Sequence, residues 1–340
     1  MKLLVPTLLM LVLPVVTFAH HSRAGYDMSV IQEIEGELVK IVWRNPHPVF
    51  TVSVDSEDRG DQLWTVEGWG ALYHLQRTGI TRENFSVGDR VRVAGFSSTR
   101  ENQHILGTHV LLSNGTEAIL RTDVGSYWTQ DHIGGQDRWG VDETQLGGIG
   151  AENRGIFRVW SPSGYARSLS TTTRHLPFKE SAIKARAAWN PEDNFVTRCE
   201  PAGMPLVMVW SVYPHSFEDQ GTEILLHSQW WDIKRKIHLT PLVPEEERPA
   251  SRLGHSAGRW EGRSLIVETT DIDWPYFDAR GTPQSKAIEV REEFTLSEDQ
   301  SRMDYRMTVT DPEVFTEPAT IETYWLALGE KIEPYDCLAQ

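Results

Sequence analysis

The stretch FSVGDRVRVAG, residues 85–95, decides the fold of the first part of the chain. A Gly-Asp turn is followed by apolar and charged residues that alternate with a period of two, which is typical of a half-buried β-strand. Other strand patterns surround it, and a short helical pattern at 71–77 precedes it. The further strands are expected at 34–42, 49–54, 63–66 and 109–112. Five strands with a helix before the fourth predict a small OB-like barrel, with a generic small sandwich as the alternative.

The second half of the chain has the same alternating character. Short apolar segments separated by turn signals follow residue 205, and one helix is expected at 179–189. The strands are expected at 206–212, 222–229, 234–239, 263–269, 287–295, 303–310 and 320–328. Regular short antiparallel strands favour a lipocalin-like barrel or a curled sheet. We therefore predict an all-β protein with domains at 20–120 and 154–340, joined by a Gly-rich linker at 121–153.

The first 19 residues have the composition of an export signal. Lys2 precedes an apolar run at 3–16, and Thr17-Phe18-Ala19 has the small residues of a cleavage site. A membrane anchor is the alternative, but about 14 apolar residues are fewer than the roughly 20 that a membrane span requires. No later stretch is long and apolar enough to cross a bilayer. We expect a signal peptide at 1–19 that is cleaved after Ala19, and a periplasmic or secreted protein without a membrane span.

Charge and cysteine content limit the function further. The chain has 340 residues, with 33 Lys and Arg against 48 Asp and Glu, and a formal net charge of −15. Nucleic acids and anionic membranes bind clustered cations, so neither is an expected partner. Cys199 and Cys337 are the only cysteines, and in an oxidising compartment such a pair is most simply a disulfide. A catalytic thiol is the alternative, although neither cysteine lies in a nucleophile motif.

Histidines at the expected cleavage point indicate a metal site. Cleavage makes His20 the first residue, so that it offers both its amine and its ring to one metal ion, and His21 follows. His47, in the turn WRNPH at 43–47, is the expected partner, and Glu67 is a further ligand or an orienting group. Nitrogen ligands of this kind suit copper or zinc. The alternative is a solvated terminus without a role.

The stretch GHSAGRWEG, residues 254–262, is the first of two candidate catalytic segments. His255 is a candidate general base, because the unperturbed pKa of histidine lies near neutrality. Arg259 is a candidate for binding an anionic group, with Trp260 as the wall beside it. The alternative is a tight loop between strands, in which Arg259 pairs with Glu261 and Trp260 plugs a barrel end.

The stretch DIDWPYFD, residues 271–278, is the second candidate segment. Its carboxylates lie beside aromatic residues, so Asp273 and Asp278 are candidate acid–base groups that would act with His255. A loop that caps the barrel mouth is the alternative.

Aromatic residues fall on or beside many strands of the second domain, and those that face inward would suit a flat, apolar ligand. These residues, with one histidine, are Trp210, Tyr213, His215, Trp230, Trp231, Trp274 and Trp325. We take five residues as candidates for ligand binding, namely Trp230, Trp231, Trp260, Trp274 and Tyr276. A packed core is the alternative.

Two groups of motifs resemble uncharacterised exported bacterial families, one over residues 19–120 and the other over 154–337. The first motifs are AHHS at 19–22, WxNPH at 43–47 and GDxVxVxG at 88–95. The second are RCxPxGMP at 198–205, GHSxGRWEG at 254–262, DP at 311–312 and ExYxC at 333–337. The resemblance implies that the His-His pair follows the signal cut. It also implies that both cysteines occupy family motif positions, which favours the disulfide. Arg263 departs from the second family, in which Asp is usual.

Our leading hypothesis is an exported two-domain β protein that binds a small apolar or aromatic molecule in its C-terminal barrel and carries an N-terminal copper or zinc site. One rival is an enzyme of the same architecture. It would be a metal-dependent oxidoreductase, or a barrel lyase, isomerase or hydrolase that uses His255 and an Asp. Another rival is an envelope assembly factor that recognises a partner protein.

Overall fold

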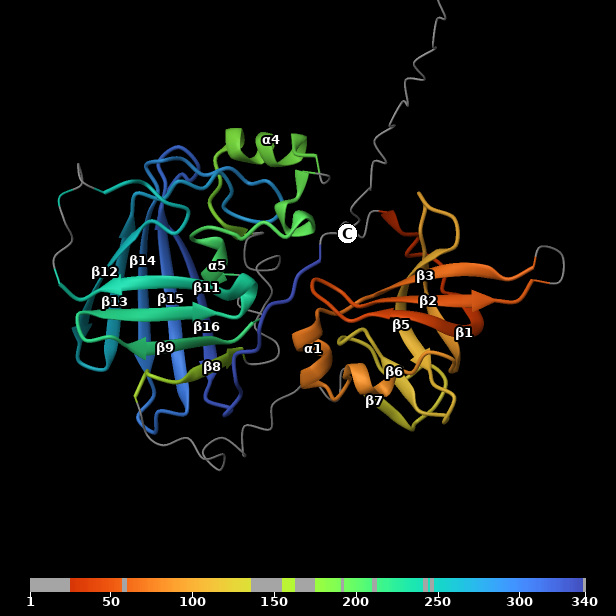
Figure 1. Cartoon of the computed structure of the whole chain (residues 1–340). Coiled ribbons are helices and arrows are strands. Elements are labelled where there is room, and N and C mark those ends of the chain that lie inside the picture. The colour runs from red at the N-terminus through yellow and green to blue at the C-terminus, as the bar shows by residue number, and fades with distance from the viewer. Residues whose placement is uncertain are drawn as a thin grey trace, which may run out of the picture.

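The computed structural model contains two closed β-barrels with a few short helices (Figure 1). It describes residues 25–56, 60–135, 155–162, 175–190, 193–209, 213–240, 244 and 248–338. The expected signal peptide, and with it His20 and His21, lies outside the described residues. The prediction of an all-β protein with two barrels is confirmed. None of the described helices has the length and hydropathy that a bilayer crossing requires.

The first barrel has the strand order of an OB fold. Its strands are β1 (Gln32–Val42), β2 (Val49–Val54), β3 (Gln62–Gly68), β4 (Arg90–Ser97) and β5 (His104–Leu111). Antiparallel pairing in the order β3-β2-β1-β4-β5 is closed by a parallel pairing of β3 with β5. The helix α1 (Leu72–Arg77) and the one-turn helix η2 (Arg82–Asn84) connect β3 to β4. Alternate apolar residues such as Val52, Val66 and Ile105 face inward and are fully buried, which explains the period of two in the sequence.

Two short strands follow β5 in this sheet, and the second lies beyond residue 120, the expected end of the first domain. They are β6 (Glu117–Ile119) and β7 (His132–Gly134), which pair in parallel. The carboxylate of Glu117 is fully buried and accepts the backbone N–H groups of Tyr127, Trp128 and Thr129 at 2.6, 2.8 and 3.0 Å. These bonds fix the connecting loop, so residues 121–135 belong to the first sheet.

The second barrel closes through nine strands, ordered β10 to β16 and then β8 and β9. They are β8 (Val159–Pro162), β9 (His215–Asp219), β10 (Glu223–Ser228), β11 (Ile233–His238), β12 (His255–Glu261), β13 (Ser264–Thr270), β14 (Glu289–Leu296), β15 (Arg302–Thr310) and β16 (Ala319–Leu326). Every pairing is antiparallel except that of β11 with β12. Short helices surround one end of the barrel (Figure 1), namely α4 (Glu180–Ala188), η6 (Phe195–Arg198), α5 (Leu206–Val209) and η7 (Trp230–Asp232).

Two segments differ from the expectation. Residues 206–209 form the helix α5 rather than the start of a strand, because a short, wholly apolar run has no periodicity that separates the two states. A tight loop between strands is the alternative interpretation of the motif at 254–262, but most of this motif is strand β12. Gly258 is needed there, since a Cβ at this position would lie 2.6 Å from Ile237 of the neighbouring strand.

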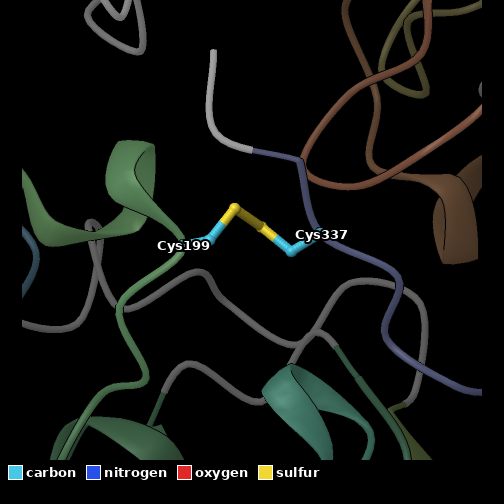
Figure 2. The surroundings of a disulfide bond; sticks show 2 residues. All are labelled: Cys199 and Cys337. Carbon is cyan, nitrogen blue, oxygen red and sulfur yellow. A yellow bond between two sulfur atoms is a disulfide. The ribbon is translucent and has the colours of Figure 1, made fainter.

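After β16 the chain runs as an extended segment between the two barrels (Figure 1), and we call residues 327–338 the C-terminal strap. Cys337 of the strap forms a disulfide with Cys199 at the end of η6, which confirms the expected pairing (Figure 2).

Candidate functional site

The strand register of the second barrel decides which side chains enter its interior. Trp160 of β8 lies directly opposite His215 of β9, and His215 lies opposite Ser228 of β10. Residues opposite one another share a face of the sheet, and all three side chains are buried. Trp325 of β16 belongs to the same face, because it pairs with Pro162, two residues from Trp160. Aromatic rings and His215 therefore share the interior.

His215 is a buried imidazole, and within the described part of the chain neither ring nitrogen has a hydrogen-bond partner. Its ring centroid lies 4.7 Å from that of Trp325, whose indole Nε1 is also unpaired there. Burial and, to a smaller extent, nearby His227 lower the pKa of His215 to about 3. The imidazole is therefore neutral at neutral pH, with one nitrogen a donor and the other an acceptor.

A buried polar network adjoins this pair. Trp325 stacks on Tyr305, with ring centroids 4.9 Å apart and planes 16° from parallel. Burial and the neighbouring Glu292 raise the pKa of Tyr305 well above its ordinary value, so the phenol stays protonated. Its hydroxyl donates to Glu292 Oε1 at 2.8 Å. Tyr305 therefore links Trp325, on which it stacks, to the carboxylate of Glu292, to which it is hydrogen-bonded.

Arg235 neutralises that carboxylate. Its Nη1 donates to Glu292 Oε1 at 3.0 Å, and its Nη2 also pairs with Glu292 Oε2. The remaining contacts go to two hydroxyls, from Nε to Ser256 Oγ at 2.9 Å and from Nη2 to Thr269 Oγ1 at 2.7 Å. Both charges are therefore paired and hydrogen-bonded, whereas His215 and Trp325 are not.

The five candidate ligand-binding residues do not share one place. Trp230 and Trp231 stack with ring centroids 4.3 Å apart. The buried ring of Phe195 lies within 6.4 Å of Trp231, Trp274 and Tyr276, so four of the five belong to one aromatic cluster. This cluster is contributed by η6, η7 and the loop after β13, and we call it the end cluster. Trp260 is separate and 43% exposed on β12, against Phe157, so it does not plug the barrel.

The candidate catalytic residues each have a different set of partners. His255 Nε2 donates to the backbone carbonyl of Pro249 at 2.9 Å. Asp278 is buried and accepts the Thr282 hydroxyl at 2.7 Å together with backbone N–H groups of its own loop. Asp273 is exposed, and its Oδ1 lies 3.8 Å from the Lys286 ammonium.

Arg259 lies on the outer surface, where it pairs with Glu261 at 2.8 Å and Glu268 at 3.0 Å. The pair of Arg259 with Glu261 is expected if the motif forms a tight loop. The structure contains this pair, although the segment is a strand. Both carboxylates neutralise the guanidinium, so an anionic ligand would have to compete with them.

Glu67 occupies a buried position on the first barrel. Its Oε2 accepts the Tyr26 hydroxyl at 2.7 Å and lies 3.9 Å from His104 Nε2. Burial raises the pKa of Glu67 to about 7. His47 lies in the loop before β2, whose first residue, Val49, pairs with Glu67. Among the described residues, no three His, Cys, Asp or Glu side chains converge to hold a metal ion, and His20 and His21 lie outside them.

Residues 9–107 match a family of unknown function, DUF6152. This match ends inside β5 and therefore covers most of the first barrel and none of the second. It agrees with the resemblance of the N-terminal part to an uncharacterised family, and it includes His47 and Glu67. No curated protein matches the chain. The DUF6152 match assigns no activity to the first barrel.

The buried ion pair inside the second barrel was not predicted from the sequence, although a signal for it was present. In IKRKIH, residues 233–238, Arg235 alternates in phase with two buried isoleucines rather than with the exposed lysines. In EVREEFTL, residues 289–296, Glu292 is likewise in phase with Val290 and Phe294. A cation and an anion that each occupy an inward position of a barrel strand predict a buried ion pair.

Proposed function

We propose that the second barrel binds a small, flat, uncharged molecule against His215 and Trp325. The observation that carries the proposal is the adjacency of these two side chains, whose polar ring atoms are unpaired within a buried interior. Buried polar groups in proteins are normally hydrogen-bonded, and each unpaired group lowers the stability of the folded protein by about 1–3 kcal/mol. A ligand that forms hydrogen bonds with His215 and Trp325 removes this loss, and the recovered free energy favours binding.

The surrounding chemistry limits the class of ligand. A neutral imidazole supplies one donor and one acceptor, and the indole of Trp325 supplies a second donor. Aromatic rings from Trp160 and Tyr305 contribute flat apolar surface to the same interior. Arg235 and Glu292 neutralise each other, so a charged ligand would find no unpaired counter-charge in this network. The best fit is an aromatic molecule that carries a hydroxyl or carbonyl group.

The experiment compares 2-naphthol with naphthalene, which differ only in the hydroxyl. Tryptophan fluorescence of the mature protein is titrated with each probe. We expect 2-naphthol to bind at least about tenfold more tightly, since one hydrogen bond to an unpaired buried group is worth about 1.4 kcal/mol or more. His215→Leu should abolish this preference.

His227→Leu is the matched control, because His227 lies opposite Ser216 on the other face of the same strands. It should leave the preference for 2-naphthol unchanged. Equal affinity of the wild-type protein for both probes, or a preference that survives His215→Leu, would show that the interior is only a packed core.

We also propose that this binding takes place outside the cytoplasm, in the periplasm or after secretion. The Cys199–Cys337 disulfide supports this location, since such bonds persist in oxidising compartments. A direct test is fractionation of cells that express the full chain with its expected signal peptide, residues 1–19, intact. Mature protein that stays in the cytoplasm would contradict the proposal.

A copper or zinc site on the first barrel is a second proposal, with His20, His21 and His47 as ligands and Glu67 as a ligand or orienting group. It is favoured by the buried carboxyl of Glu67, which is hydrogen-bonded to Tyr26, six residues after His20. The test compares a chain that starts at His20 with one that has an extra N-terminal Ala, by calorimetric titration with copper. Equal copper affinity of the two chains would exclude a site built on the terminal amine.

A further inference from the structure

The C-terminal strap is held by the second barrel on one side. The backbone N–H of Glu333 donates to Gln229 Oε1 at 3.2 Å, and that of Tyr335 donates to Asp232 Oδ2 at 3.0 Å. The ring of Tyr335 packs against Tyr213 at 5.5 Å, in addition to Trp231 at 5.7 Å. These contacts seat the strap on the η7 edge of the barrel and on part of the end cluster.

The other side of the strap is paired with the first barrel. Asn45 donates its backbone N–H to Asp336 O at 2.8 Å and accepts from the N–H of Leu338 at 2.9 Å. The guanidinium of Arg44 lies 3.1 Å from the Asp336 carboxylate. Asn45 belongs to the turn WRNPH, and Asp336 lies in the segment EPYDC at 333–337. The two motifs that the sequence analysis singled out at opposite ends of the chain therefore bind each other.

A second contact between the barrels is made by Glu330, near the beginning of the strap. Glu330 Oε2 accepts the hydroxyl of Tyr73 of α1 at 2.8 Å and that of Ser161 of β8 at 2.5 Å. Arg77 of α1 donates to the backbone carbonyl of Pro162 at 2.6 Å. The strap thus supplies groups to both barrels along its whole length.

The disulfide is the one covalent tie that holds the strap in this position beyond its root at β16 (Figure 2). Cys337 lies between Asp336 and Leu338, which are the two residues that pair with Asn45. Both cysteines are partly exposed, and Cys199 is flanked by the exposed residues Arg198 and Glu200. A reductant can therefore reach the bond without unfolding of either barrel.

We propose that the Cys199–Cys337 disulfide is a redox-controlled latch on the docking of the two barrels. While the bond is closed, the strap joins the WRNPH turn to the second barrel. A thiolate of a dithiol reductant attacks one of the two sulfurs and expels the other cysteine as a thiolate. The second thiol of the reductant then attacks the mixed disulfide and expels the remaining cysteine. The protein gains two electrons and two protons as two thiols, and the reductant leaves as a disulfide. The free strap end then detaches from Arg44 and Asn45, while the contacts that Glu330 and Arg77 make between the barrels remain.

The experiment measures amide hydrogen exchange of the mature chain, starting at residue 20, with and without dithiothreitol. We expect reduction to raise exchange at least tenfold in peptides that contain Asn45 and Leu338, because their mutual backbone bonds open. Peptides from β14 and β15, in the wall of the second barrel, should not change. Cys199→Ser with Cys337→Ser should reproduce the reduced pattern without reductant, and a chain that ends at residue 328 should match it in peptides around Asn45.

Two results would overturn the proposal. Unchanged protection of Asn45 in the reduced protein would mean that the non-covalent contacts hold the strap by themselves. Loss of protection in β14 and β15 as well would mean that the bond stabilises the whole fold and does not act on docking. This test is independent of the ligand proposed for the barrel interior, since neither His215 nor Trp325 contacts the strap through any of the bonds above.

Discussion

Arg235 and Glu292 form an ion pair inside the second barrel, where their side chains are 1% and 0% exposed. Removing one partner leaves an uncompensated buried charge. We expect Glu292→Gln to lower the free energy of unfolding by about 3–5 kcal/mol, as measured by urea denaturation. The double variant Arg235→Met with Glu292→Leu should lose much less, because neither charge remains to be buried. A double variant as unstable as the single one would indicate that the pair itself stabilises the barrel.

His215 makes the stability of the protein fall in acid. Its pKa is about 3 when folded, whereas a free histidine has a pKa of about 6.5. Between these values the unfolded chain takes up a proton that the folded one does not, so stability is lost as pH falls from 6.5 toward 3.

Between pH 7 and pH 5, the free energy of unfolding of the wild-type protein should therefore fall by about 2 kcal/mol more than that of the His215→Leu variant. Urea denaturation of both proteins at each pH measures this difference. If His215→Leu and the wild type lose the same amount, His215 is accessible to protons in the folded state.

Gly281 is packed directly under Trp189. A Cβ at this position would lie 2.0 Å from Cγ of the indole, and the residue has a φ of +73°. We expect Gly281→Ala to destabilise the protein by at least about 2 kcal/mol and to shift the tryptophan emission spectrum, because both the ring and the backbone must move. Gly262→Ala is the matched control: its φ is +63°, but no atom lies within 4 Å of its Cβ position. Gly262→Ala should lower the free energy of unfolding by only about 1 kcal/mol, which is the cost of placing an alanine in a left-handed backbone conformation.

Asp278 and Asp273 should respond differently to removal. Asp278 is buried and holds its own loop through the N–H and hydroxyl of Thr282 and the N–H of Arg280, at 2.7–3.1 Å. We expect Asp278→Ala to cost about 2–3 kcal/mol in thermal or urea unfolding, since several buried donors lose their acceptor. Asp273→Ala, which removes an exposed carboxylate, should stay within about 0.5 kcal/mol of the wild type. Equal losses would contradict a structural role that is specific to Asp278.

The sequence was most informative where a pattern is local. Alternation along Val91 and Val93 follows directly from the inward and outward positions of β4, and the helix before it interrupts that period. These signals predict the OB-like barrel, because each strand and turn can be recognised within about ten residues. Residues 206–209 are the exception, since an unbroken apolar run fits a helix and a strand equally well.

The candidate site inside the second barrel was not predictable in the same way. His215 and Trp325 are 110 positions apart in the sequence, and they meet only because β8 joins β9 to β16 and closes the barrel. No pattern within a short stretch of sequence indicates that His215 and Trp325 are in contact. The end cluster illustrates the same point, since Phe195, which joins Trp231 to Trp274, comes from a segment without strand or helix periodicity of its own.

The pairing of Asn45 with the strap has a consequence for biosynthesis. Every strand needed to close the first barrel has been translated once Leu111 is made, but the residues that dock onto its WRNPH turn come only after β16, the last strand of the second barrel. All strands of the first barrel therefore precede, in the order of synthesis, the residues that attach its WRNPH turn to the second barrel. A nonsense mutation after β16 would keep every strand of both barrels but remove the strap contacts at Asn45 and Tyr73, so that of the contacts described above only the bond from Arg77 to Pro162 would still link the two barrels.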